Sequence, residues 1–163
     1  MNAQDAIRTT LETSSMVLSS YLSDLSDADL MSRPTKGCNH VAWQLGHLIA
    51  SECMLLDSIC PGAAAELPAG FAEAHSKDMC GEEDASKFCT KQEYIDLFEK
   101  VHGATLAALE KASADDLDAE SPEQFRKMFP TVGHIFVLIS THGMMHAGQL
   151  VPVRRNLGKA VVI

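Results

Sequence analysis

Four stretches of the chain carry the periodicity of amphipathic helices, and this pattern limits the fold more than any other feature. Apolar residues recur at helical intervals in residues 3–25, 39–60, 90–112 and 131–157, the spacing that places them on one face of an α-helix. Segments with strand-like alternation are hard to find. Helices of this kind bury their apolar faces most economically against one another. The sequence therefore predicts an all-α protein, a four-helix bundle in a single domain over residues 1–163.

Local signals place the ends of these helices. Asn39 is a good N-cap for the second helix, and the third begins with a capping box in which Thr90 is followed three residues later by Glu93. Gly158 is placed to stop the last helix. The first helix is expected to reach about Leu25, where a polar connection begins.

The connection between the second and third helices is unusually long. Residues 61–89 are rich in Gly, Pro, Ala and acidic residues, so we expect little regular structure there beyond a short helix. A second polar stretch, residues 113–130, leads into the last helix, and Pro122 suits the first turn of another short helix. Nothing repeats at a period typical of solenoids.

Charge and hydropathy exclude two classes of partner. The formal net charge is −9, and without a Lys/Arg stripe such a chain would be repelled by a phosphate backbone. The longest apolar run, Ile135 to Ile139, is far below the roughly 20 residues that span a bilayer. The first residues lack the basic start and apolar core of a secretory signal. We therefore expect neither nucleic acid nor a membrane as partner.

The cysteines point to a reducing compartment. There are five, an odd number, with no CxxC pair, which argues against a complete disulfide framework and against a zinc ribbon. Cys53 falls on an apolar helical face and is expected to be a small buried side chain. The cytoplasm is the location that this pattern favours.

Two histidines in the last helix raise the question of a metal site. His142 and His146, in THGMMHAGQL, lie four positions apart, which leaves them about 40° apart around the helix and about 6 Å apart along it. Both rings can therefore reach one ion. Two such histidines can also simply face solvent or form hydrogen bonds, but the apolar residues around this pair leave few solvated positions.

The second helix offers a third ligand. His40 and His47 point in nearly the same direction but lie about 10.5 Å apart along the axis, so only one of them can join the pair. His47 lies in the middle of its helix, whereas His40 lies beside the N-cap. A ligand in mid-helix matches a pair in mid-helix better, which favours His47.

The sequence resembles the DinB-like (DinB/YfiT-like) superfamily. The resemblance rests on WQLGHL, residues 43–48, and HGMMHAGQLVPVRRNLG, residues 142–158, and on helix order over nearly the whole chain. It implies a four-helix bundle with a divalent metal, commonly nickel or zinc, bound by His47, His142 and His146. It also implies small-molecule chemistry, since the family includes S-transferases that use low-molecular-weight thiols, a maleylpyruvate isomerase and hydrolases, beside many members without an assigned activity.

Other side chains near these histidines have candidate roles. Glu52, five residues after His47, could orient a ligand ring or act as a general base, and Gln149, three after His146, could hydrogen-bond a ring or the backbone. Either residue could equally be a solvated helix residue. Trp43 is expected to be a core anchor more than a platform for a substrate.

Two further histidines lie apart from the predicted site. His134 is about 12 Å from His142 along the last helix, too far to share its ion, and His40 is excluded by its position near the helix start. Both are expected to be capped or partly exposed, with a substrate contact or a proton transfer as the alternative.

Two classes of function remain open from the sequence. The first is a metal-dependent enzyme that acts on a small molecule by hydrolysis or thiol transfer. The second is a bundle that binds a metal or ligand without turnover, as a stress-related protein or a dimeric scaffold. An apolar bundle face favours a homodimer in either case.

Overall fold

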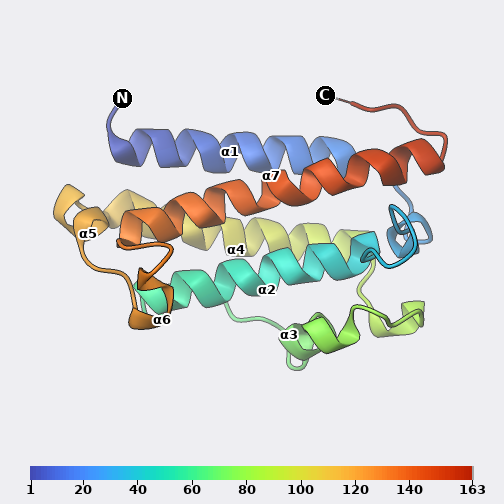
Figure 1. Ribbon diagram of the computed structural model, residues 1–163, viewed down its shortest axis with the longest axis horizontal. Coiled ribbons are helices and arrows are strands. Elements are labelled where there is room, and N and C mark those ends of the chain that lie inside the picture. The colour runs from blue at the N-terminus through green and yellow to red at the C-terminus, as the bar shows by residue number, and fades with distance from the viewer. Residues whose placement is uncertain (163) are drawn as a thin grey trace.

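Four long helices build the protein, as the sequence predicts. The computed structural model describes residues 1–162, and its long helices are α1 (Ala3–Leu22), α2 (Val41–Ile59), α4 (Lys91–Lys111) and α7 (Val132–Asn156) (Figure 1). Shorter α-helices and 3-10 turns lie between them: α3 (Phe71–Ala74), α5 (Ala114–Asp118), α6 (Glu123–Arg126), Asp29–Met31, Lys77–Met79 and Ala85–Lys87. Within residues 1–162 no strand forms. The predicted all-α bundle is confirmed.

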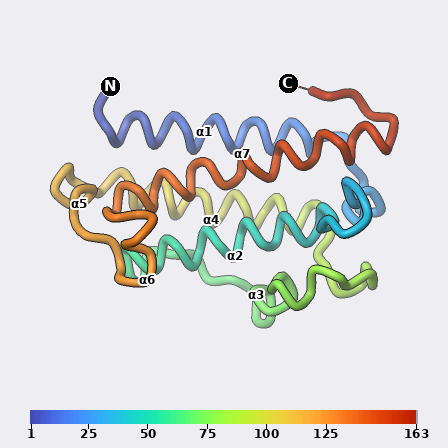
Figure 2. The backbone as a smooth tube through the Cα atoms, viewed as in Figure 1, coloured from blue at the N-terminus to red at the C-terminus, as the bar shows by residue number. Residues whose placement is uncertain are grey.

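The long connection determines how the helices are directed. α1 and α7 run the same way, and α2 and α4 run together in the opposite direction (Figure 2). The chain therefore has to travel back along the bundle between α2 and α4, and residues 61–89, which we call the strap, do so on the outer side of α2 (Figure 1). The strap contains α3 and two of the 3-10 turns, in agreement with the expectation of little regular structure.

Apolar side chains from all four long helices fill the interior. One buried group lies toward the end of the bundle where α2 begins and includes Leu18, Leu48 and Val153, and the other lies toward its opposite end and includes Leu11, Leu56 and Phe136. Cys53 is buried as expected, and burial is the main reason why the pKa of its thiol rises to about 11. No helix in residues 1–162 combines the length and apolar character needed to cross a membrane.

The start of α2 differs from the prediction by one residue. The N-cap is His40, not Asn39: His40 Nδ1 accepts a hydrogen bond from the backbone N–H of Trp43 at 3.0 Å. Since this nitrogen accepts, Nε2 carries the proton and donates to the carbonyl of Glu82 in the strap at 3.2 Å. The Asn39 carbonyl accepts instead from the side chain of Gln44. His40 thus caps α2 and attaches the strap to it.

The capping role of His40 predicts a dependence of stability on pH. Burial, and secondarily the charge of Arg33, lowers the pKa of His40 below its ordinary 6.5. Below about pH 6.5 the unfolded chain takes up a proton that the folded protein resists, so the free energy of unfolding falls as pH falls from 6.5 toward the lowered pKa. In His40→Asn, which keeps an N-cap that does not titrate, urea unfolding should show a shallower decline between pH 7 and pH 5.

A matched control for this prediction is His134→Asn. His134 is exposed at the start of α7, where its Nδ1 lies 2.8 Å from Thr131 Oγ1. This variant should keep the pH profile of the wild type. Parallel profiles for the wild type and His40→Asn would contradict the assignment of the pH dependence to the helix cap.

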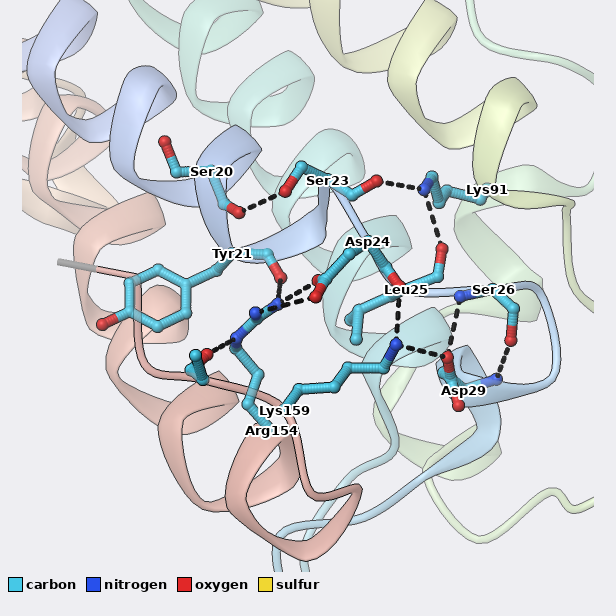
Figure 3. Close-up of polar contacts among 11 residues, drawn as sticks. Ser20, Tyr21, Ser23, Asp24, Leu25, Ser26, Asp29, Lys91, Arg154 and Lys159 are labelled. Carbon is cyan, nitrogen blue, oxygen red and sulfur yellow. Dashed lines mark hydrogen bonds and ion pairs between the residues drawn. The ribbon is translucent and has the colours of Figure 1, made fainter.

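α1 ends at Leu22, three residues before the predicted end, and Arg154 from α7 lies at this end (Figure 3). The guanidinium Nη1 donates to the Tyr21 carbonyl at 2.7 Å, and the two Nη atoms reach the two carboxylate oxygens of Asp24 at 2.5 and 3.1 Å. Its Nε donates to the Ala160 carbonyl at 2.6 Å. The sequence predicts only a favourable charge for Arg154 at the end of its helix, whereas the side chain is buried and connects the C-terminal end of α1 with the segment that follows α7.

Candidate metal centre

His47, His142 and His146 form one compact group between α2 and α7. One ring nitrogen from each lies within 4.8 Å of the others, and the ring centroids are 5.0 to 5.5 Å apart. An ion bound tetrahedrally at about 2.1 Å from each nitrogen needs nitrogens about 3.4 Å apart, so nitrogens at the upper limit of 4.8 Å would have to approach one another on binding. The group could hold a metal ion. The structure thus brings together the three side chains that the helix spacing selects.

A buried glutamine fixes the orientation of His146. Gln44 Nε2 donates to the Asn39 carbonyl at 2.9 Å, and its Oε1 accepts from His146 Nδ1 at 3.0 Å. Because an amide oxygen can only accept, the proton of His146 is on Nδ1 and the lone pair of Nε2 is free for a metal. Such an outer contact fixes both the tautomer and the direction of a ligand ring.

Trp43 holds the ring of His47. The indole stacks on the imidazole with centroids 4.8 Å apart and planes 7° from parallel, and its Nε1 donates to the Ser76 carbonyl of the strap at 2.8 Å. Trp43 is buried, which fits the expected core anchor. His47 Nδ1 also lies 3.5 Å from the hydroxyl of Ser51.

The three rings are uncharged at neutral pH, as metal ligands must be. Burial, followed by the charges of the neighbouring histidines, lowers the pKa of His146 to about 4. Burial and His47 likewise lower the pKa of His142 to about 4, against the opposing field of Glu52. For His47 the pKa is lowered by burial and then by Lys77. The donor set therefore fits a divalent cation without the need to expel protons from the rings at pH 7.

Glu52 lies near the group, with its closest contacts on α4. Its Oε1 accepts from the Thr105 hydroxyl at 2.6 Å and lies 3.4 Å from His102 Nδ1. Glu52 and His142 line the same small cavity. A role for Glu52 as general base stays a prediction.

Gln149 is exposed on α7, as expected for the alternative of a solvated helix residue. The amide that contacts His146 belongs to Gln44 on the facing helix. Gln44 lies three residues before His47 and so near the same helix face, but this position does not indicate the contact with His146.

His75, from the strap, is a second residue that the helix patterns did not reveal. Its ring is buried, donates from Nδ1 to the Phe71 carbonyl at 2.7 Å, and accepts at Nε2 from the Tyr94 hydroxyl at 2.6 Å. The ring lies against Gly46, where a Cβ atom would be only 2.0 Å from Cδ2 of the imidazole. The glycine before His47 therefore gives the strap room to pack beside the histidine group. No periodicity marks His75, because it follows the short helix α3.

Comparison with known proteins identifies the family. A solved structure described as the conserved protein of locus from Enterococcus faecalis shares the fold, with a TM-score of 0.73 and 19% sequence identity over 98% of this chain and 99% of that chain. No curated protein matches the chain. A family model of the DinB superfamily matches residues 10–150, which contain all three histidines of the group. The chain therefore belongs to the DinB superfamily.

Proposed function

We propose that this protein is a metal-dependent enzyme that acts on a small molecule by hydrolysis or thiol transfer, with a divalent ion bound by His47, His142 and His146. The observation that carries the proposal is the convergence of three uncharged imidazoles from two helices within 4.8 Å. Imidazole donors suit zinc and nickel. Membership in the DinB superfamily supports a metal site of this type.

The side chains around the group have definable tasks. Three protein ligands leave coordination positions open, and an ion bound there would supply Lewis acidity that activates a water molecule or a low-molecular-weight thiol. The hydrogen bond from His146 Nδ1 to Gln44 leaves the lone pair of His146 Nε2 available for a metal ion. The stacked indole of Trp43 limits rotation of the His47 ring. Burial keeps all three rings uncharged.

Metal content tests the site directly. After incubation with zinc or nickel and desalting, the wild type should retain about one equivalent by elemental analysis, and His146→Ala should bind the ion about 100-fold more weakly or worse because a ligand is lost. Gln44→Leu keeps all three ligands and should lose about 10- to 100-fold in affinity. His134→Ala, on the same helix but outside the group, should bind as the wild type does. A wild type that binds neither metal would refute the site.

Activity then separates an enzyme from a binder. Metal-loaded protein is assayed with ester and amide substrates and with a low-molecular-weight thiol plus an electrophile. Turnover that disappears on chelation and in His146→Ala supports the proposal. Turnover that survives loss of the metal contradicts it, and stoichiometric metal without turnover in any assay favours a binding protein instead.

A further inference from the structure

Two neighbouring cavities are lined by residues of α1, α2 and α4, and one of them also by residues of α7. One, which we call the inner cavity, has a volume of about 10 Å³, and its wall includes Glu52, His102 and His142. The other, which we call the outer cavity, has a volume of about 70 Å³, and its wall includes Leu18, Leu22, Leu45 and Ile95. Ser15 and Phe98 belong to both walls. The two cavities therefore adjoin at Ser15 and Phe98, and the carboxylate and the two imidazoles belong to the wall of the inner one.

The polar groups of the inner cavity are incompletely satisfied by the protein. Glu52 is only 7% exposed, and the side chain of His102 only 12%. Within residues 1–162 neither ring nitrogen of His102 has a hydrogen-bond partner, although Nδ1 lies 3.4 Å from Glu52 Oε1. Buried polar atoms are nearly always paired, because an unpaired one costs about 1–3 kcal/mol. An imidazole in this state, beside the buried carboxylate of Glu52 on the wall of a cavity, forms a candidate ligand site.

We propose that the paired cavities bind a primary alkylamine, with its ammonium group in the inner cavity beside Glu52 and His102 and its chain in the outer one. A volume of about 10 Å³ accommodates roughly one water-sized group, which admits an ammonium or hydroxyl and excludes a carboxylate or phosphate. The carboxylate of Glu52 favours the ammonium over the hydroxyl, because a charge-assisted hydrogen bond is about twice as strong as a neutral one. The net charge of −9 also favours a cation.

The outer cavity sets the length of the chain. Its volume of about 70 Å³ is about half of the ~150 Å³ that accommodates a benzene ring, so a short unbranched alkyl chain fits and a bicyclic ring does not. His142 belongs to the inner wall, but the contacts proposed for the amine need no metal. The amine site goes beyond the proposed function, and the failure of one proposal would not refute the other.

Calorimetric and NMR titrations of chelator-treated protein with n-butylammonium, n-butanol and butyrate test the site. Butylammonium should bind at least about tenfold more tightly than butanol, and butyrate should not bind, because Glu52 favours a cation in a space too small for a carboxylate. Equal affinity for all three probes, or no binding of the amine, would overturn the proposal.

Variants locate the binding in the cavities. Glu52→Gln keeps an acceptor for Thr105 and should weaken amine binding about tenfold or more. Glu99→Gln, at the exposed rim of the outer cavity, removes the same charge outside and should change the affinity less than about twofold. Ile95→Trp fills the outer cavity and should abolish binding. This variant tests the site independently if Glu52→Gln does not fold. An affinity unchanged by the Glu52 or Ile95 variants would refute the site.

A metal ligand variant separates this site from the metal centre. His146→Ala should bind butylammonium as the wild type does, with or without added zinc. Loss of amine binding in this variant, or its appearance only with zinc, would show coordination of the amine by the ion and would contradict the proposal. A protein that binds no metal at all would leave the predicted amine titration unchanged.

Discussion

Replacing Gly46 with alanine is expected to lower the free energy of unfolding by about 3 kcal/mol. The new Cβ would lie 2.0, 2.2 and 2.3 Å from Cδ2, Cγ and Nε2 of His75, well inside the contact distance of carbon atoms. The His75 ring is 3% exposed and is held on both sides, by the Phe71 carbonyl and the Tyr94 hydroxyl. It can move only by breaking these hydrogen bonds and lifting the strap from α2.

Chemical denaturation of Gly46→Ala and Gly103→Ala measures this effect. Gly103 lies in α4, and a Cβ atom added there would have no atom within 4 Å, so alanine at this position should be neutral or stabilise by up to about 1 kcal/mol through helix propensity. In the double variant with His75→Ala, the cost of Gly46→Ala should largely disappear, because the clashing ring is gone. Equal stability of the two glycine variants would contradict the proposed contact.

Arg154→Ala is expected to destabilise the protein by about 3 kcal/mol or more. The side chain is 2% exposed, makes hydrogen bonds to three residues, and lies with its Cζ 5.8 Å from the centre of the Tyr21 ring. Asp24 is half exposed and would be solvated after the loss. Most of the cost would therefore come from the buried Tyr21 carbonyl and from lost packing of the guanidinium stem.

Its neighbour in sequence provides the control. Arg155 is exposed on the same turn, and Arg155→Ala should change stability by less than about 0.5 kcal/mol. Arg154→Lys keeps the charge but lacks the planar fork that reaches Asp24 and Tyr21 together, so it should fall between the wild type and Arg154→Ala. Similar urea midpoints for the two alanine variants would show that burial of Arg154 contributes little.

Helix periodicity was sufficient to predict much of this protein. The spacing of His142 and His146, and the position of His47 in mid-helix, follow from the geometry of single helices, and the structure brings these three together. Thr90 caps α4 through the predicted capping box. The four-helix architecture required only the recognition of apolar faces.

The contacts that the sequence did not reveal are between segments far apart in the chain. Gln44 and His146 are 102 residues apart, and a polar residue on a helix gives no sign of which facing side chain it will meet. The choice of His40 over Asn39 as N-cap depends on the strap, which supplies the Glu82 carbonyl as second partner. Arg154, which contacts the Tyr21 carbonyl near the end of α1, is 133 residues away from it in the chain.

The placement of the histidines on α2 and α7 has a consequence for the order of folding. His47 belongs to the first third of the chain and His142 and His146 to the last helix, so the three rings converge only after a long chain loop has closed. A ribosome-bound chain that lacks α7 offers a single ligand. An ion bound by all three histidines would thus stabilise only molecules whose final helix has docked, and metal retention would report on the completion of synthesis and folding.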